Sequence, residues 1–232
     1  MIKESSLFTS LWMKNSLKGG VELSKITKIE IQKNNKNRVN LFIDEAFFMG
    51  CYVDLVYRFN LEQGMEIDTD KLKKLIEEQE YEACKQKALD LITRAEKSEK
   101  AMRNKLLERY SQVAVDRVID FLKNYSILDD ERYARNIVQN NQLYKRNGRN
   151  KIKQTLYLKG IERTEIEKSI EYIDEDKELE NAIYLAEKKI RKIKEKDERI
   201  IKNKLYQHLS YKGFGYNIIK KAISSVINSY ED

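Results

Sequence analysis

The feature that most constrains this chain is an apolar pattern that recurs along its second half. The pattern is three residues spaced four apart, and it returns after 50 and then 53 residues: Met102, Leu106 and Tyr110; Ile152, Leu156 and Gly160; Leu205, Leu209 and Gly213. A four-residue spacing of apolar side chains marks one face of a helix. A recurrence at nearly fixed period is typical of tandem structural repeats.

Each copy of the pattern is flanked by two further segments with helical spacing. The segment before it contains Ala88 and Leu91, Tyr133 and Val138, or Ala182 and Ala186; the segment after it contains Val115 and Leu122, Ile166 and Ile173, or Ile219 and Val226. We therefore predict a mainly α fold in which three tandem three-helix repeats form an elongated curved array. The expected boundaries of the repeats are residues 87–125, 126–173 and 174–232.

Helix starts support these boundaries. Asp129 precedes two further acids and is expected to cap a helix, and Asp174 and Asp197 are expected to do the same in the third repeat. Thr164 followed by Glu167 has the spacing of a capping box.

Glycines mark the expected helix ends, because the chain contains no proline. Gly160 followed by Ile161 predicts a left-handed cap with a hydrophobic contact, and Gly213 followed by Phe214 repeats the arrangement. Gly148 is expected to lie in a looser loop and to tolerate alanine better than Gly160.

The N-terminal part has a different period. Residues 27–31 and 39–43 alternate apolar and polar side chains, and a turn at Asp44-Glu45 leads into residues 46–51. We predict a small β-hairpin or three-stranded meander within residues 25–86, with β structure confined to about 25–51. One or two helices follow: one after Val53 that covers the sheet, and one from Asp68 that leads into an acidic stretch at residues 77–82, which is expected to be a solvated linker. Residues 1–24 are expected to be a poorly ordered tail.

Composition excludes several classes of protein. No uncharged stretch exceeds nine residues, so we expect no membrane span. Cys51 and Cys84 are far apart and lack a nearby histidine, which argues against a metal site or a disulfide framework and favours the cytoplasm. His208 is expected to be a partly exposed helix residue. Nucleotide-binding and hydrolase motifs are absent from the sequence, so we expect no catalytic residue, no cofactor and no metal.

Positive charge is concentrated in the repeats. Residues 87–232 carry 32 basic and 24 acidic side chains, whereas residues 1–86 carry 13 and 14. Two basic clusters fall at predicted loop-to-helix corners, and we expect them to bind DNA or a protein partner: Lys145, Arg146, Arg149, Lys151, Lys153 and Lys159; Lys202, Lys204, Lys212, Lys220 and Lys221. The alternative interpretation is that these basic residues only form solvated faces of their helices.

Orientation of the side chains can also be predicted. Arg149, Lys151 and Lys153 are expected to point into solvent and to contribute little to stability. Five tyrosines interleave with the basic residues, and we expect most of them to belong to the core: Tyr144, Tyr157, Tyr206, Tyr211 and Tyr216.

One motif points to a family. Residues 126–134 read Ser-Ile-Leu-Asp-Asp-Glu-Arg-Tyr-Ala, and residues 158–160 read Leu-Lys-Gly. Here the chain resembles the RecX family of regulators of the recombinase RecA, which shows Gly-Tyr-Leu-Asp-Asp-Glu-Arg-Phe/Tyr-Ala and a basic helix ending Gln-Lys-Gly. The resemblance covers about residues 25–230, including a β extension like that of Gram-positive members. Ser126 and Tyr110 stand where the family usually has glycine, and no proline precedes Ser98.

The resemblance implies a function. It implies a non-enzymatic modulator of homologous recombination and DNA repair, a monomer that occupies the groove of the RecA filament on single-stranded DNA and lowers ATP hydrolysis and strand exchange. Two alternatives stay open. The chain could be a sequence-independent DNA-binding repeat protein that acts without the recombinase, or an interaction scaffold that makes no DNA contact.

Overall fold

The computed structural model describes residues 23–231, and residues 1–22 and 232 lie outside that part. The chain divides into two compact units, Met1–Ala83 and Cys84–Asp232. The expected tail of residues 1–24 therefore falls almost entirely outside the described residues, and Ser24 already begins the first strand. None of the helices within residues 23–231 has the length and apolar character needed to cross a bilayer.

The first unit contains an antiparallel sheet with strand order β3-β2-β1-β4. Its strands are β1 (Ser24–Gln32), β2 (Asn35–Ile43), β3 (Ala46–Tyr52) and β4 (Glu66–Ile67). The meander β1-β2-β3 confirms the alternating pattern, and the turn residues Asp44 and Glu45 have φ of 48° and 66°, which suits a tight hairpin. The restriction of β structure to residues 25–51 was wrong. β4 pairs with the start of β1, and a two-residue strand is too short to show a period in sequence.

Two helices pack in this unit, α2 (Val53–Arg58) and the first part of α3 (Thr69–Arg94). Leu55 on α2 and Leu72 and Ile76 on α3 are buried. Glu80 on α3 is also buried and forms an ion pair with Arg38 of β2, with Arg38 Nη1 at 3.4 Å from Glu80 Oε1. The prediction that the acidic stretch is solvated holds for the exposed Glu78 and Glu82 and was wrong for Glu80, which is buried against β2.

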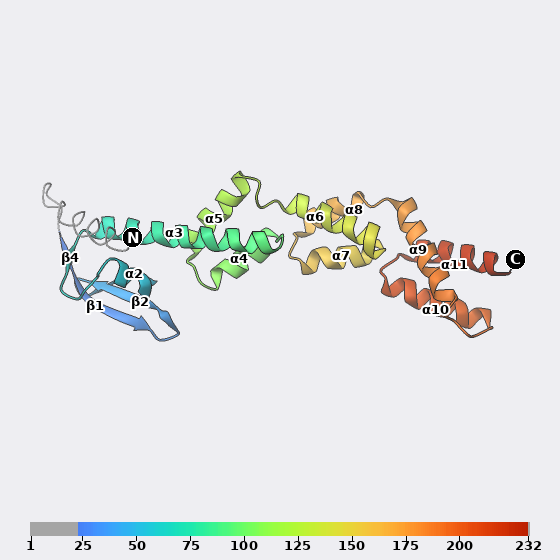
Figure 1. The fold of residues 1–232 in the computed structure, drawn as a ribbon, viewed down its shortest axis with the longest axis horizontal. Coiled ribbons are helices and arrows are strands. Elements are labelled where there is room, and N and C mark those ends of the chain that lie inside the picture. Colours follow the sequence, from blue (N-terminus) through green and yellow to red (C-terminus); the bar gives the residue numbers. More distant parts are fainter. Residues whose placement is uncertain (1–22, 232) are drawn as a thin grey trace. The chain divides into compact units, whose positions relative to one another are not determined.

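The second unit is helical throughout its described residues, as predicted, and Figure 1 shows its helices in sequence order. The last part of α3 precedes α4 (Glu99–Leu107) and α5 (Gln112–Asn124) in the first repeat. The second repeat has α6 (Asp130–Asn140), the π-helix η2 (Asn141–Lys145), α7 (Arg149–Leu158) and α8 (Arg163–Glu171). The third has α9 (Glu175–Ile190), α10 (Glu198–Tyr211) and α11 (Tyr216–Glu231).

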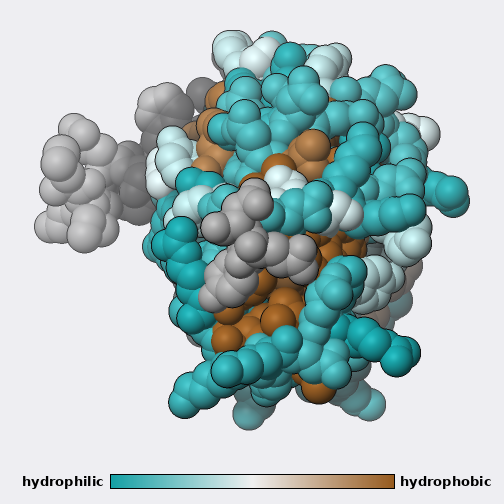
Figure 2. Space-filling view, turned by 90° about the vertical axis from the view of Figure 1, so that its right-hand side faces the viewer, coloured by the Kyte–Doolittle hydropathy of each residue, from teal (hydrophilic) through white to brown (hydrophobic). Residues whose placement is uncertain are grey.

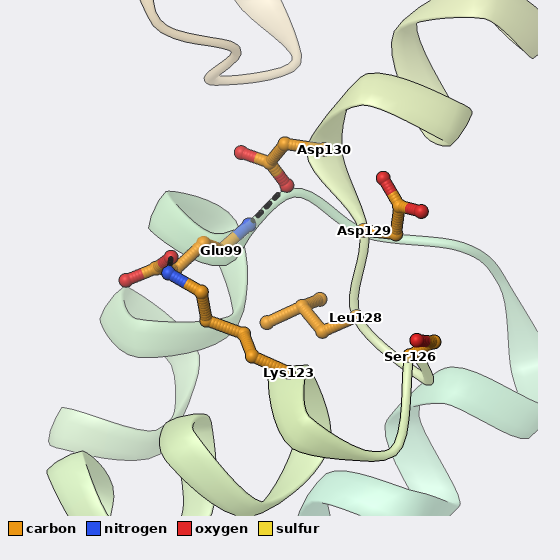
Figure 3. A pocket seen from close by; sticks show the side chains of 6 residues that line it. All are labelled: Glu99, Lys123, Ser126, Leu128, Asp129 and Asp130. Atoms are coloured by element: carbon orange, nitrogen blue, oxygen red, sulfur yellow. Dashed lines mark hydrogen bonds and ion pairs between the residues drawn. The ribbon is translucent and has the colours of Figure 1, made fainter.

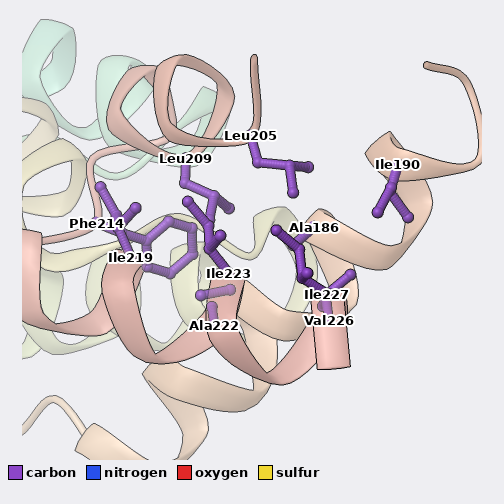
Figure 4. Close-up of a cluster of buried hydrophobic side chains, with 11 residues drawn as sticks. Ala186, Ile190, Leu205, Leu209, Phe214, Ile219, Ala222, Ile223, Val226 and Ile227 are labelled. Atoms are coloured by element: carbon purple, nitrogen blue, oxygen red, sulfur yellow. The ribbon is translucent and has the colours of Figure 1, made fainter. Parts of the chain in front are cut away.

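The repeating apolar pattern forms the cores. Six of its residues are completely buried: Met102, Leu106, Ile152, Leu156, Leu205 and Leu209. In the third repeat, Leu205 and Leu209 of α10 face Ile219, Ile223 and side chains of α9 (Figure 4). Figure 2 shows hydrophobic residues, in brown, between hydrophilic ones on the face of the molecule that it draws.

Most predicted helix caps are confirmed. The carboxylates of Asp129, Asp174 and Asp197 accept hydrogen bonds from first-turn N–H groups of α6, α9 and α10. The capping box at Thr164 was wrong, because α8 begins one residue earlier at Arg163 and its N-cap, Glu162, makes no side-chain capping bond. Gly160 and Gly213 have φ of +83° and +87°, which confirms the left-handed caps.

Candidate nucleic-acid and partner interface

The two basic clusters of the sequence meet where α7 begins and α10 ends. The Gly148 N–H donates to the Lys212 carbonyl at 3.0 Å, and the Asn150 N–H donates to the Gly213 carbonyl at 3.0 Å. These bonds join the second repeat to the third. They bring Lys212 of one cluster beside residues 148–151 of the other.

Two glycines allow this approach. A Cβ on Gly148 would lie 2.5 Å from the Phe214 nitrogen, and a Cβ on Gly213 would lie 2.3 Å from the Lys151 nitrogen. Because both obstacles are backbone atoms, a side chain at either position would force the helices apart. The prediction that Gly148 lies in a loose loop was therefore wrong.

Lys151 lies at the centre of this contact. Its Nζ has no carboxylate partner within residues 23–231, donates to Gln154 Oε1 at 3.0 Å, and lies 5.7 Å from the centre of the Tyr211 ring. Tyr211 immediately precedes Lys212 and is 76% exposed. A lysine over an exposed aromatic ring keeps its charge at the surface while its stem packs against the ring.

The segment before Gly148 is braced by buried amide side chains. Asn147 Nδ2 donates to Asn141 Oδ1 at 2.9 Å, and Asn141 Nδ2 donates to the Ile137 carbonyl at 2.8 Å. Gln142 Nε2 donates to the Asp174 carbonyl at 2.8 Å, and Asn181 Nδ2 donates to the Gln142 carbonyl at 2.8 Å. We call residues 141–147 the braced loop. A network of side-chain hydrogen bonds of this kind favours one conformation of the loop.

Arg146 lies in the braced loop, and its side chain contacts α9. Its backbone is left-handed, with φ 52° and ψ 43°, and its guanidinium carbon lies 3.6 Å from the centre of the Tyr184 ring of α9. This distance is that of a stacked pair, which leaves the N–H edges of the guanidinium available. The side chains of Lys145, Arg146, Lys151 and Lys212, with the rings of Tyr184 and Tyr211, are called the junction surface below.

Arg149 has a different role from the one predicted. Its Nε lies 3.0 Å from Glu178 Oε2, and its Nη2 lies 3.0 Å from Glu175 Oε1. Its backbone N–H also donates to Glu178 Oε1 at 2.7 Å. The Glu178 side chain is 0% exposed, so Arg149 neutralises a buried carboxylate. The expectation that Arg149 points into solvent and contributes little to stability was wrong.

The remaining predicted site residues lie elsewhere. Lys153 pairs with Glu167, with Lys153 Nζ at 2.6 Å from Glu167 Oε1. Lys202 and Lys204 pair with Glu198 and Glu195 near the start of α10, more than one turn from Lys212. The others are exposed, at the end of α7 and in α11: Lys159, Lys220 and Lys221. Of the predicted site residues away from the junction, Lys153, Lys202 and Lys204 are therefore already paired with carboxylates.

The assignment of most of these tyrosines to the core was wrong. Five of them are exposed: Tyr144, Tyr157, Tyr206, Tyr211 and Tyr216. Tyr184, Glu178 and the amides of the braced loop were not identified from sequence. The consecutive Asn140 and Asn141 at a helix end were the only sequence signal for the loop.

The junction between the first and second repeats has the same plan with different side chains. The Ser98 hydroxyl donates to the Lys159 carbonyl at 2.6 Å, and the Glu99 N–H donates to Asp130 Oδ1 at 2.8 Å. A pocket of about 260 Å³ opens there, and Figure 3 shows Glu99, Asp130 and Lys123 on its wall. Burial raises the pKa of Asp130, and the neighbouring Glu99 carboxylate raises it further, although the hydrogen bond from the Glu99 N–H opposes the shift.

Family models match all three repeats and the N-terminal sheet. The regulatory protein RecX N-terminal domain matches residues 24–68, and the RecX first, second and third three-helix domains match residues 84–122, 129–170 and 175–223.

Whole proteins match over similar lengths. A protein from Clostridioides difficile (strain 630) named "Regulatory protein RecX" is 43% identical over 203 residues, which is 88% of this chain and 96% of that protein. One of the same name from Clostridium botulinum (strain Alaska E43 / Type E3) is 40% identical over 209 residues, 89% of this chain and 98% of that protein. A crystal structure titled regulatory protein RecX aligns with a TM-score of 0.60 at 26% identity, over 85% of this chain and 98% of that one.

Proposed function

Because this chain belongs to the RecX family of regulatory proteins, we propose that it inhibits RecA by binding, as a monomer, in the groove of the RecA filament on single-stranded DNA. Regulation of RecA follows from the family. Occupation of the groove, contact with single-stranded DNA and inhibition are the parts that we propose. The protein acts by occupying a surface, without catalytic chemistry of its own.

The observation that carries this proposal is the junction surface. Cations from two successive repeats converge there, and backbone hydrogen bonds hold the repeats in contact. A cationic surface with exposed aromatic rings suits the phosphates and unstacked bases of single-stranded DNA. Repeat proteins also present side chains from successive units at regular intervals, which suits a filament built of repeated subunits.

The test is a titration of this protein against the ATPase activity of the cognate RecA on single-stranded DNA. We expect wild type to lower ATP hydrolysis and strand exchange, while hydrolysing no ATP and cutting no DNA itself. Lys145→Glu combined with Lys212→Glu should weaken inhibition, because both changes reverse charge on the junction surface. The matched control is Lys202→Glu with Lys204→Glu, because these lysines already pair with Glu198 and Glu195.

Two outcomes would count against the proposal. Absence of inhibition by excess wild type would remove the role as a RecA inhibitor. Equal weakening by the test pair and the control pair would leave the role and remove the junction surface as its site.

The second candidate function is sequence-independent DNA binding without the recombinase. The positive charge of the second unit favours it, since phosphate contact alone gives non-specific affinity. Binding to bare single-stranded DNA and to RecA-coated DNA, compared across a salt series, separates the two. A direct binder prefers naked DNA and loses affinity steeply as salt rises, whereas a filament binder prefers the coated strand.

A further inference from the structure

We infer that the braced loop is a preorganised clamp for single-stranded nucleic acid, in which Arg146 binds a phosphodiester with its N–H edge and stacks a base on its free face. This inference rests on the proposed function and deepens it by assigning one ligand class to one loop. It starts from three observations on Arg146 and its surroundings.

First, the backbone of Arg146 is held in an unfavourable conformation. Its φ of 52° lies in the left-handed region, which residues with a Cβ adopt rarely and at a cost. Left-handed residues other than glycine cluster at functional sites when the surrounding structure enforces them. Here the preceding five residues form a π-helix, an element that is itself rare and frequent at functional sites.

Second, the protein stabilises this conformation with buried hydrogen bonds. Asn141 and Asn147 bond each other across the loop by side chain and by backbone, with the Asn147 N–H at 3.0 Å from the Asn141 carbonyl. Gln142 and Asn181 join the loop to α9. A loop that only connected two helices would not need four amide hydrogen bonds, two of them buried and two partly buried. Preorganisation reduces the entropy lost when a ligand binds.

Third, the Arg146 guanidinium is stacked but unpaired. It lies flat over Tyr184, and no hydrogen bond or ion pair of its N–H groups occurs among residues 23–231. The nearest arginine along the chain, Arg149, forms ion pairs with both Glu175 and Glu178 of α9. These two carboxylates contact Arg149 and not Arg146, so the Arg146 guanidinium stays available to a ligand.

The geometry favours nucleic acid over a carboxylate-bearing peptide. A guanidinium stacked on a ring offers a planar face on which a base can stack, in addition to the edge that binds an anion. Tyr144 of the same loop is 79% exposed and supplies a second ring close by in the chain. Stacking requires bases that are not paired in a duplex, so the expected ligand is single-stranded.

The experiment measures binding of a dye-labelled thymidine oligonucleotide to the full chain by fluorescence anisotropy at several salt concentrations. Four variants are compared: Arg146→Gly, Arg146→Lys, Tyr184→Leu and the control Arg135→Gly. Arg135 lies in α6 of the same repeat and pairs with Glu131. Unfolding by urea is recorded for each variant.

Arg146→Gly is the decisive variant. Glycine accepts the left-handed conformation, so the fold should not be weakened at this position, while the ligand contact is lost. We expect affinity to fall about tenfold, the scale of one lost base stack, and the slope of log affinity against log salt to drop by about 0.7. Arg146→Lys and Tyr184→Leu should lower affinity while leaving the slope unchanged, because the charge remains.

Several results would overturn the inference. Wild-type affinity in Arg146→Gly would do so, as would an equal loss in Arg135→Gly or no binding of bare oligonucleotide by wild type. Loss of RecA inhibition with unchanged oligonucleotide binding would show that the loop contacts protein instead. Failure of the proposed function looks different: wild type would bind the oligonucleotide with the expected Arg146 dependence and yet leave RecA ATPase activity unchanged.

Discussion

The junction between repeats one and two and the junction between repeats two and three share one backbone plan and differ in their side chains. In both, the start of a middle helix meets the left-handed end of the next middle helix, and an acid from the following repeat accepts the first N–H. At the first junction the Ser98 hydroxyl donates to the Lys159 carbonyl, whereas at the second junction the Gly148 backbone N–H donates to the Lys212 carbonyl. The two backbone segments therefore approach more closely at the second junction, which leaves less room for an added side-chain atom.

Charge differs as well. At the first junction, the N–H that meets the acid belongs to Glu99, so two carboxylates lie together and need Arg103 and Lys123 as partners. At the second, the corresponding residue is Arg149, which pairs with that acid directly. The acids of α9 at this junction pair with Arg149, and no ion pair of Arg146, Lys151 or Lys212 occurs among residues 23–231. The same backbone plan thus gives a first junction whose acids pair with nearby cations, and a second junction with cations available for a ligand.

The largest expected effect comes from adding a methyl group at the two left-handed glycines. Gly160→Ala and Gly213→Ala both place a Cβ at positive φ, which costs about 1–2 kcal/mol. At Gly213 the new atom also meets the Lys151 backbone at 2.3 Å, whereas at Gly160 the nearest atom is the Ser98 side-chain oxygen at 3.0 Å. Overpacking should increase the loss of stability by about 1–3 kcal/mol in Gly213→Ala only. Urea unfolding measures the stability of both variants. Equal losses of stability would contradict the closer backbone approach at Gly213.

Arg149→Ala should have the next largest effect, because it leaves the buried Glu178 carboxylate without its ion-pair partner. Breaking a buried pair costs about 3–5 kcal/mol, and the partial exposure of Arg149 reduces the expected loss to about 2–3 kcal/mol. Glu99→Ala at the first junction should cost less than about 1 kcal/mol, since its partners are partly exposed. If Arg149→Ala unfolds at the same urea concentration as wild type, the pair contributes nothing to stability.

How far the sequence predicts this structure depends on whether a feature is local. The repeat period, the caps at Asp129, Asp174 and Asp197, and the left-handed Gly160 and Gly213 depend on residues a few positions apart, so they could be predicted.

The errors are contacts between distant segments. Gly148 meets Phe214, Arg149 meets Glu178 and Arg146 meets Tyr184, across 29 to 66 positions, and no local pattern records such pairs. The basic clusters were visible in sequence, but the division into paired and unpaired cations was not.

A smaller, stabilising effect is expected at Ser126, which lines the pocket of the first junction and has φ of 53° (Figure 3). Ser126→Gly removes the steric cost of a Cβ at positive φ and should raise stability by about 0.5–1 kcal/mol. The comparison is Ser111→Gly, where the serine has φ of −67° and its hydroxyl caps α5. That change should lower the urea midpoint, and a loss at both serines would show that the Ser126 backbone is not strained.

The acids of the first junction should respond to pH with opposite signs. The pKa of Asp130 is raised by burial, so the folded protein holds this proton more tightly than the unfolded chain, and stability falls as pH rises above 3.8. Burial would raise the pKa of Glu99, but hydrogen bonds from Lys123 and Arg103 lower it, so its contribution is present above pH 4.5 and is lost as pH falls. Asp130→Asn should therefore reduce the fall in stability as pH rises above 3.8. Glu99→Gln should reduce the fall in stability as the solution is acidified. Thermal unfolding between pH 3 and 7 measures both, and responses of the same sign would contradict the assignment.

The smallest expected effect is a change in the pKa of His208, the only histidine of the chain, which lies one turn before Lys212 on α10. Burial lowers this pKa first, and the charges of Lys189 and Lys212 lower it further. Lys212→Gln should therefore raise the pKa of His208, because one source of positive potential is removed. Lys159→Gln changes the corresponding lysine of the first junction and should leave the pKa of His208 unchanged. A single imidazole signal followed by NMR across pH decides between them. Equal shifts in the two variants would mean that His208 senses the net charge of the protein, and that the second junction has no local positive potential of its own.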